Sequence, residues 1–542
     1  MLQKIRSVMD KLTLGRDALA FWLRCRFLAH AGVGCSSGSR RVLIVSLTNS
    51  VCQLKYECML AKALQLHGYT PIIAIPRRAR LALHYFRTVG FSEFVCLDDF
   101  VTPTVLRDAG SEAQRLLECV GGVKSLFSLE YRGVQIGRHV LSTILCRRYD
   151  GRINLSDPGE RDSVRLGLEE GIRAVLAAEA LYEEVHPDLV LFNEKSYVPY
   201  GPIFDVGLQR GLYPIQFIAG HRHGSLVFKR YNLETRNLHA FSLSRASWDR
   251  VKRMPWNPEM SQGVVDEMLE SYKAGSWFRQ KYLDVNRRLY SPDEVRDTLK
   301  LDSRKPTAVV FSHVLWDGTF FYGDSLFEDY ETWLVETVRA ACRNRALNWI
   351  VKLHPDYAYK MRMARLPGAE VPDVQALQEA VGNLPDHIRL LLPSTNISTV
   401  SLLDVMDYAL TVRGTVGIEM PCFGIPVLTA GTGRYSGLGF TIDSASREQY
   451  VDRLANLEEQ PRLTHEQVEL ARRHAYALLN LRPCRFTTFE PVYARFERLG
   501  HPLDFNISIR ARSAREIEQA HDLRAFAEWA TSDGLDFLSP LP

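Results

Sequence analysis

The densest run of residues that can do chemistry extends from Arg413 to Glu419 and reads Arg-Gly-Thr-Val-Gly-Ile-Glu. Arg413 carries a fixed positive charge suited to a phosphate, and Gly414 permits a tight turn with close approach of the backbone. Thr415 is predicted to cap a helix whose first N–H groups, near Gly417, face an anion. Glu419 follows one helical turn after Thr415 on the same face, where its carboxylate can accept hydrogen bonds from ribose hydroxyls. The run therefore predicts a nucleotide site.

Two further groups of donors follow predicted strands. Lys352 and His354 alternate along one strand, so both are expected on one face, and Pro355 fixes the turn after them. They offer donors to a phosphate or to a sugar that bears a carboxylate. Ser312 and His313 begin a long polar and aromatic loop that could cover a bound ligand. The alternatives are a structural histidine at 354 and a surface loop with buried aromatic side chains after 312.

A glycine-rich loop lies between Gly431 and Gly439, with four glycines in nine residues. Gly433 and Arg434 lie within it. The loop lacks the Gly-Lys-Ser/Thr ending of a P-loop, so a mononucleotide-binding P-loop is excluded. We predict instead a second loop that contacts the phosphate or the sugar of the donor.

The first half of the chain offers candidates for acid–base chemistry. Glu194 ends a predicted strand and is the first candidate for a general base or a nucleophilic carboxylate. His221 and His223 follow the next strand, and either could act as a base, while Arg222 could hold an acidic acceptor. A salt bridge between Glu194 and Lys195, or a structural role for each of these residues, is the alternative.

The elements that must position these residues alternate between apolar runs and helical stretches. Such alternation predicts parallel sheets covered by helices on both faces. Ligands of such sheets bind outside the carboxyl ends of the strands, and between two such domains the default site is the cleft. The fold class expected is α/β, with two Rossmann-like doubly wound domains facing a cleft and extra N- and C-terminal helices. Strands are expected at 41–47, 71–75, 94–97, 189–192 and 213–217, and then at 308–312, 349–353, 388–392, 408–412 and 426–429.

A chain of 542 residues is too long for one core, which stops growing near ~250–300 residues. The sequence predicts an N-terminal Rossmann-like acceptor domain and a C-terminal Rossmann-like domain that binds the nucleotide sugar. A helical connector joins them, and further helices follow to about residue 535. The expected divisions are 1–40 (basic amphipathic helical segment), 41–240 (acceptor domain), 241–304 (connector), 305–460 (nucleotide-sugar domain) and 461–542 (C-terminal helices).

Composition excludes several classes of protein. The formal net charge is +4, and no run of Lys or Arg resembles a nucleic-acid tail, so nucleic acid is not the expected partner. The ten cysteines are scattered without a Cys-x-x-Cys pair, which predicts neither a disulfide framework nor a zinc site. No apolar stretch is long enough to span a bilayer. Asp10 and Asp17 interrupt the N-terminus, which therefore does not resemble a signal peptide.

Residues 1–30 nevertheless combine apolar positions at helical spacing with several Lys and Arg residues. This segment is predicted either to pack on the protein body or to rest on an anionic membrane as an interfacial helix. The expected location is the cytoplasm. If the segment rests on a membrane, the protein is expected to lie peripherally on the cytoplasmic face of the inner membrane.

Three motifs in the second half together resemble a known family. They are Lys-x-His-Pro ending at Pro355, Arg-Gly-Thr-x-Gly-x-Glu from Arg413, and Phe-Gly-x-Pro-Val from Phe423. This combination resembles the capsule polysaccharide biosynthesis family of GT-B glycosyltransferases, which includes transferases that use CMP-Kdo. Bacterial sialyltransferases share the His-Pro feature, and the CDP-glycerol glycerophosphotransferases have a related C-terminal domain. The resemblance covers about residues 305–460 and extends to the first half only in architecture.

The resemblance implies roles for four of these residues. His354 would contact the nucleotide phosphate, and Thr415, Gly417 and Glu419 would bind phosphate and nucleoside. Many relatives have Ser-Ser or Ser-Thr where this chain has Gly414 and Thr415. The implied co-substrate is a nucleotide sugar, CMP-linked if the resemblance extends that far, with no separate cofactor and no metal.

The function expected is transfer of a sugar from this donor to a growing surface or capsular polysaccharide or to a glycolipid. The expected partners are the nucleotide sugar and a glycan or lipid-linked glycan acceptor. Three alternatives stay open at this point: a CDP-polyol phosphotransferase with the same C-terminal site, a non-hydrolysing sugar epimerase, and a non-catalytic scaffold of a polysaccharide assembly complex.

Overall fold

The computed structural model describes residues 2–32, 40–274, 288–363, 370–493 and 503–541. The chain divides into two units. Unit 1 comprises Met1–Thr143, Arg161–Arg236 and Arg482–Ser539, and unit 2 comprises Ile144–Glu160, Asn237–Leu481 and Pro540–Pro542. The segment after residue 481 thus belongs mainly with the first half of the chain, whereas the sequence grouped it as separate C-terminal helices.

Unit 1 is built on a seven-stranded sheet in the order β13-β6-β5-β4-β1-β2-β3. The strands β1 to β5 are parallel, while β6 runs antiparallel to β5 and β13 antiparallel to β6. The apolar run of β1 is buried at all four of its last positions, as expected for a strand covered on both faces. The strands are β1 (Arg40–Val45), β2 (Tyr69–Ile75), β3 (Phe94–Cys96), β4 (Leu189–Phe192), β5 (Ile215–Ala219), β6 (Ser225–Arg230) and β13 (Cys484–Arg485).

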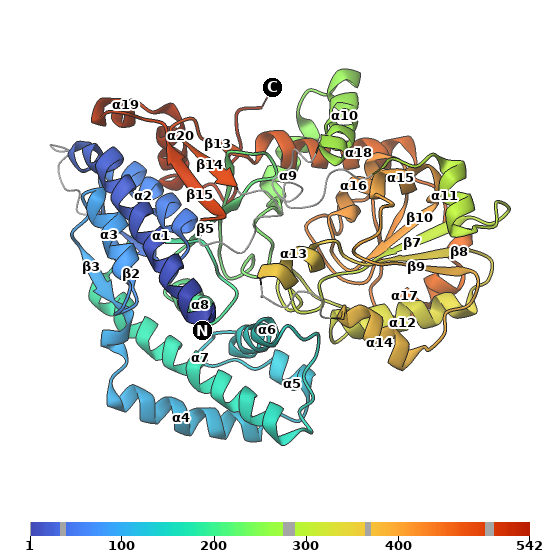
Figure 1. The fold of residues 1–542 in the computed structure, drawn as a ribbon, viewed down its shortest axis with the longest axis horizontal. Helices are drawn as coiled ribbons and strands as arrows, with labels where there is room; N and C mark the ends of the chain where they lie inside the picture. Colours follow the sequence, from blue (N-terminus) through green and yellow to red (C-terminus); the bar gives the residue numbers. More distant parts are fainter. Residues whose placement is uncertain (1, 33–39, 275–287, 364–369, 494–502, 542) are drawn as a thin grey trace. The chain divides into compact units, whose positions relative to one another are not determined.

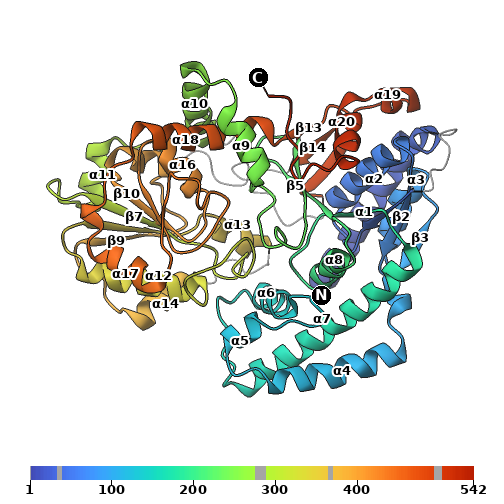
Figure 2. The same cartoon turned by 180° about the vertical axis from the view of Figure 1, so that it is seen from behind.

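Helices cover this sheet and extend beyond it. Figures 1 and 2 both show α4 and α7 side by side, and the Arg161 guanidinium of α7 donates to the carbonyls of Leu117 and Val120 at the end of α4. The helices of or entering unit 1 are α1 (Leu2–Cys25), α2 (Val51–Leu66), α3 (Arg80–Thr88), α4 (Pro103–Glu118), α5 (Val123–Phe127), α6 (Ile136–Arg148), α7 (Pro158–Val185), α8 (Tyr200–Gln209), α19 (Ala514–Glu518) and α20 (His521–Ala530).

The prediction of helices throughout the C-terminal segment is wrong in part. Besides β13, an antiparallel pair forms from β14 (Phe489–Tyr493) and β15 (Phe505–Ile509). In β15 Ile507 and Ile509 are buried two residues apart, which is the period of a strand rather than of a helix. These strands pack into the same apolar core as β1 and α2, which explains why the segment belongs to unit 1.

Unit 2 contains a six-stranded, all-parallel sheet in the order β12-β11-β10-β7-β8-β9. Numbered within the unit, this is 3-2-1-4-5-6 from the β9 edge, the Rossmann order, and β1 to β5 of unit 1 follow 3-2-1-4-5. The prediction of an α/β fold with two Rossmann-like doubly wound parts is therefore confirmed. The strands are β7 (Thr307–Phe311), β8 (Asn348–Lys352), β9 (Ile388–Leu391), β10 (Tyr408–Thr411), β11 (Val427–Thr429) and β12 (Ile442–Asp443).

Alternate residues of β7 enter different cores. Ala308 and Val310 pack with α12, α14 and α17, whereas Val309 and Phe311 pack with α11, α15 and α16. Figure 1 shows these two groups of helices on opposite faces of the sheet. The helices of unit 2 outside α6 and α7 are α9 (Arg245–Arg253), α10 (Pro258–Ala274), α11 (Pro292–Leu299), α12 (Tyr330–Arg343), α13 (Asp356–Met363), α14 (Pro372–Ala380), α15 (Thr399–Leu402), α16 (Val416–Cys422), α17 (Arg447–Ala455) and α18 (His465–Tyr476). Among the helices described in either unit, none has the length and hydropathy needed to cross a membrane.

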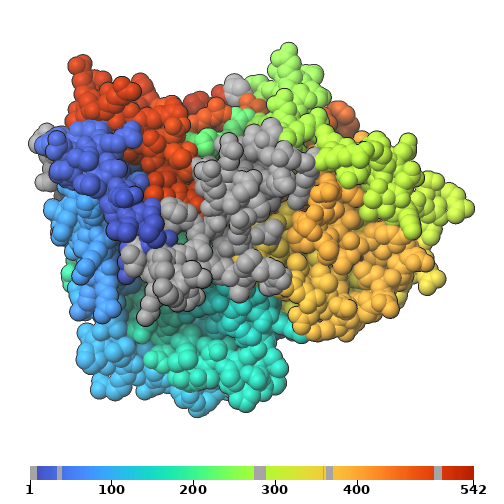
Figure 3. Space-filling model, in the orientation of Figure 1, coloured from blue at the N-terminus to red at the C-terminus, as the bar shows by residue number. Residues whose placement is uncertain are grey.

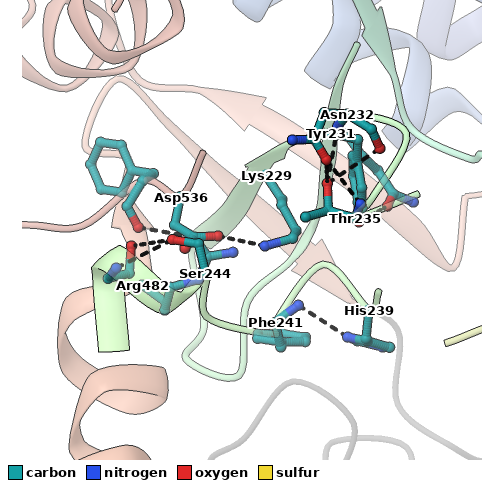
Figure 4. A network of polar contacts seen from close by, with 12 residues as sticks. Lys229, Tyr231, Asn232, Thr235, His239, Phe241, Ser244, Arg482 and Asp536 are labelled. Atoms are coloured by element: carbon teal, nitrogen blue, oxygen red, sulfur yellow. Dashed lines mark hydrogen bonds and ion pairs between the residues drawn. The ribbon is translucent and has the colours of Figure 1, made fainter. Parts of the chain in front are cut away.

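A buried ion pair fastens the end of the chain to unit 1. The Nζ of Lys229 on β6 lies 2.7 Å from the Oδ1 of Asp536, and the Nη1 of Arg482 lies 3.6 Å from the same oxygen (Figure 4). All three side chains are fully buried. The backbone N–H of Arg230 also donates to the carbonyl of Leu535 at 2.7 Å. The Asp536 carboxylate is thus the counter-ion of two buried cations.

We expect Asp536→Ala to lower the free energy of unfolding of unit 1 by about 3–5 kcal/mol, because it leaves two buried cations without their carboxylate. Urea titration followed by circular dichroism measures this. Asp533→Ala is the control, since Asp533 is exposed and its loss should change stability by less than about 0.5 kcal/mol. Equal stability of the two variants would contradict this role for Asp536.

Candidate active site

The strand order of unit 2 reverses between β7 and β10, and His313 lies at this switch point. Its Nε2 accepts a hydrogen bond from the backbone N–H of Val412 at 3.2 Å and lies 3.1 Å from the Thr411 hydroxyl. The ring stacks on Tyr330 with 4.2 Å between centroids. Burial, and then the charges of His354 and two arginines, lower the pKa of His313 well below its usual range. His313 is therefore neutral and joins the ends of the two strands.

Arg413 follows β10 and is the least satisfied group of the switch point. Its side chain is 95% buried, with a relative exposure of 5%. Nη1 donates to the carbonyls of Phe321 and Gly323. Nε and Nη2 have no hydrogen-bond partner among the described residues. These two atoms form the edge of the guanidinium that binds an oxyanion with two parallel hydrogen bonds. An anion bound along that edge would supply the missing acceptors.

The other predicted donors have different surroundings. The Nζ of Lys352 is buried and donates to the carbonyl of Ile397 at 3.0 Å. His354 is half-buried, and its Nδ1 accepts from the N–H of Asp356 at 3.1 Å, so a neutral His354 carries its proton on Nε2. Its backbone N–H donates to the Oγ of Ser312 at 3.1 Å. Ser312 thus fastens the end of β7 to the turn after β8.

Glycines of the two loops lie in close packing. A Cβ on Gly417 would overlap the ring of Tyr435, whose hydroxyl donates to the carbonyl of Gly414 at 3.0 Å. A Cβ on Gly433 would lie 3.1 Å from the Cβ of Arg413. The glycine-rich loop is thereby held against the turn after β10. Tyr435, which the sequence analysis did not single out, is the residue that connects the two loops.

Arg434 extends the positive charge around this turn. Its guanidinium lies 5.9 Å from the ring of Phe241. After burial, which is the larger cause of each shift, the charges of both Arg413 and Arg434 act to lower the pKa of His313 and of Tyr330, so both guanidinium groups lie near these two rings. The structure therefore brings His313, Arg413 and Arg434 together at the carboxyl end of the unit 2 sheet.

The prediction that Thr415 caps a helix whose first N–H groups face an anion is wrong, while the predicted contacts of Thr415 and Gly417 with a nucleotide remain predictions. Thr415 has helical backbone angles (φ −62°, ψ −23°), and its side chain makes no capping hydrogen bond. The N–H groups of Gly417 and Ile418 donate to the carbonyls of Gly414 and Thr415, so they do not face an anion. The cause is the tight first turn of α16, which uses these donors internally.

Glu419 is likewise engaged inside unit 2. Its buried carboxylate accepts hydrogen bonds from the hydroxyls of Tyr272 and Thr415. Burial raises the pKa of Glu419, and burial together with the Glu419 carboxylate raises the pKa of Tyr272. The predicted contact of Glu419 with ribose remains a prediction, and a nucleoside hydroxyl would have to compete with the Tyr272 phenol.

In unit 1 the corresponding switch point lies between β1 and β4, and Glu194 follows β4. Its Oε1 accepts from the N–H groups of Lys195 and Ser196, each at 2.7 Å. Burial raises the pKa of Glu194. The Lys195 ammonium donates to the carbonyl of Arg236 at 2.6 Å. The carboxylate is thus oriented by the backbone of its own turn.

A second carboxyl group, which the sequence pattern did not indicate, lies at the same end of the sheet. Glu57 on α2 is fully buried, and it accepts from the Ser46 hydroxyl at 2.5 Å and from the Gln53 amide at 3.0 Å. Burial raises the pKa of Glu57 to about 8. Burial, and then the nearby carboxyls of Glu57 and Glu194, raise the pKa of Tyr200, whose hydroxyl accepts a hydrogen bond from the N–H of Leu47 at 3.0 Å. The sequence signal that could have indicated this buried carboxyl group is an acidic residue within the mostly apolar helix α2.

His221 and His223 lie in the turn from β5 to β6, also at the carboxyl end of a parallel strand. His223 is exposed and His221 is half-buried. Gly224, with a φ of +74°, closes this turn in the left-handed region that favours glycine. Their predicted roles as bases remain predictions.

Comparisons with known proteins add only remote likenesses. No protein-family profile and no curated protein sequence matches the chain. It is similar to the solved structure of the UDP-GlcNAc 2-epimerase of Neisseria meningitidis bound to UDP-GlcNAc, at 13% identity over 81% of this chain and 96% of that chain, with a TM-score of 0.27. It is also similar to the β-Kdo 2,4 transferase KpsC of Thermosulfurimonas dismutans, at 14% identity over 61% and 87%, with a TM-score of 0.31. Likenesses this remote carry no argument about function.

We expect Glu57→Gln to flatten the pH dependence of stability. With a pKa of about 8 when folded and an ordinary value of 4.5 otherwise, Glu57 contributes stability that is fully present below pH 4.5. This contribution is lost as the pH rises through 8, by up to about 1.4 kcal/mol per pH unit. Urea titrations between pH 5 and 8.5 measure this. The exposed Glu118→Gln is the control, and equal slopes in both variants would contradict a buried, protonated Glu57.

Proposed function

We propose that the protein is a GT-B glycosyltransferase that moves a sugar from a nucleotide-activated donor to a growing surface or capsular polysaccharide or to a glycolipid. The observation that carries this proposal is the buried edge of the Arg413 guanidinium at the switch point of unit 2. A buried cation with two unused donors is costly, and an oxyanion is the ligand that relieves the cost. In sheets of this order, ligands bind at the switch point.

The donor site follows from what surrounds Arg413. Arg434 and the Nε2 of His354 supply further positive charge and a further donor for a phosphate. The motifs that include Lys352, His354 and Thr415 resemble those of enzymes that use CMP-linked sugars, which favours a cytidine nucleotide. During transfer the bond between the anomeric carbon and the phosphate oxygen breaks. The charge that develops on the leaving phosphate would be stabilised by Arg413, without a metal.

The acceptor is proposed to bind unit 1. Glu194 would take the proton of the acceptor hydroxyl as its oxygen forms the new bond to the anomeric carbon. Two backbone N–H groups hold the carboxylate in one orientation, while burial raises its pKa and strengthens it as a base. His221 and His223 are the alternative bases. The proposed location is the cytoplasm, with peripheral contact at the inner membrane.

The donor site predicts a stabilising nucleotide. We expect one of CMP, CDP, UDP, GDP or ADP to raise the melting temperature, since a ligand at 100 times its Kd stabilises a fold by about 2.7 kcal/mol. CMP alone would favour a Kdo- or sialic-acid-type donor, and CDP a polyol-phosphate transferase. Arg413→Gln should abolish the shift, whereas the exposed Arg345→Gln should keep it. A shift that survives Arg413→Gln, or no shift with any nucleotide, would contradict the site.

The catalytic role of Glu194 has a separate test. We expect Glu194→Gln to lower turnover about 100-fold or more, because the amide cannot accept the proton of the acceptor. The thermal shift with the nucleotide should remain, since it reports binding in unit 2. Glu93→Gln, at an exposed position of unit 1, is the control. Normal turnover in Glu194→Gln would remove this residue from the mechanism and leave His221 and His223 as candidates.

A further inference from the structure

Helix α1 exposes an apolar stripe. Of the twelve exposed large hydrophobic side chains among the described residues, five lie on this one helix, and four of them are 56–57% exposed. Figure 3 shows α1, in dark blue, at the surface of unit 1. The five side chains are Met9, Leu12, Leu19, Trp22 and Leu23. At 100° per residue Met9, Leu12, Leu19 and Leu23 fall within about 80° of one another, so they form one stripe along the helix.

One basic residue lies within the stripe, and two others flank it. Lys11, Arg16 and Arg24 of α1 are exposed; Arg16 falls inside the stripe, Lys11 on one flank and Arg24 on the other. Asp17 lies about 120° from the centre of the stripe, where Lys55 pairs with it at 2.8 Å. Asp10 precedes Asp17 by two helical turns and shares its side. The outward face of α1 therefore combines apolar and positively charged groups.

A basic groove lies beside this face, between α1 and α3. It has a volume of about 530 Å³. Arg26, Arg80 and Arg87 line it, together with Trp22, whose ring lies 5.2 Å from the guanidinium carbon of Arg26. The remaining lining residues are Ala29, Leu83, His84 and Thr88, so the lining contains no carboxylate. Three guanidinium groups around one hollow fit a phosphate-bearing headgroup.

We propose that unit 1 docks on an anionic phospholipid bilayer through this surface, which we call the α1 face. The arginines of the groove bind the phosphate of a lipid headgroup, while the apolar stripe enters the interfacial region of the bilayer. Apolar area and positive charge on one helix are the combination that binds an anionic membrane surface. A second protein would need acidic groups as well as an apolar surface, whereas a bilayer of anionic lipids supplies both together. This docking rests on the peripheral membrane contact proposed above and adds the surface and the lipid charge, while none of these residues belongs to the proposed donor site.

The test is flotation of the full chain with vesicles of phosphatidylcholine alone or with a third of phosphatidylglycerol. We expect binding to the anionic vesicles, weak binding to the neutral ones, and loss of binding at high salt. Each basic residue near such a surface contributes about five-fold to binding. The combined variant Arg26→Glu, Arg80→Glu and Arg87→Glu should therefore bind at least about 100-fold more weakly. Leu19→Ser with Leu23→Ser should also weaken binding without a change of charge.

The control carries the same change of charge on other helices of unit 1: Arg107→Glu, Arg115→Glu and Lys124→Glu, all exposed. If the control variant binds as tightly as wild type, the α1 face is supported. If it loses as much binding as the groove variant, the proposal is overturned, because net charge alone would then explain the binding. Release from vesicles by millimolar inorganic phosphate would also overturn the proposal, because the groove would then prefer free phosphate. Melting temperatures with nucleotide, measured on all variants, show separately whether the donor site is intact.

Discussion

The proposed donor site depends on one constraint, the burial of a guanidinium that the protein itself does not fully satisfy. Arg413 uses only Nη1 in hydrogen bonds to the backbone, and the opposite edge has no acceptor among the described residues. Unsatisfied buried groups cost stability and persist where function requires them. The neighbouring His313 stays neutral, which limits the repulsion that a second buried cation would add. An anionic ligand would complete this arrangement.

The two switch points carry groups of opposite character. In unit 2 the strand ends gather guanidinium and imidazole groups, while in unit 1 they gather the carboxyls of Glu57 and Glu194. Glycosyl transfer needs both: positive charge where the nucleotide leaves and a base where the acceptor loses its proton. Burial raises the pKa of both carboxyls, that of Glu57 to about 8. Glu194 directly follows β4 at the switch point, which favours it over the helical Glu57 as the base.

Five strands of each sheet, β1 to β5 and β7 to β11, could be predicted because buried parallel strands are continuous apolar runs, such as Val42–Val45 and Ala308–Phe311. The strands β6, β12 and β13 to β15 were not predicted. For β13 the reason is a distant partner: Cys484 pairs with Leu226, and no local pattern encodes that contact. The cluster at residues 413–419 was located correctly as a turn after a strand. The conformation of Thr415 was not predicted, because a tight first turn and a capped helix share the same residue types.

The glycines of the candidate site show that a motif can be located from sequence although the physical reason for its residues is different from the one predicted. Gly417 and Gly433 were both predicted to contact a ligand, yet Gly417 is required already by the ring of Tyr435, and a Cβ on Gly433 would be in tight contact with the Cβ of Arg413. Tyr435 then bonds to the carbonyl of Gly414 and fixes the turn that carries Arg413. Contacts within the protein thus hold the two loops together. A rigid, prearranged set of donors is what stabilises developing charge most effectively, because no reorganisation is needed during the reaction.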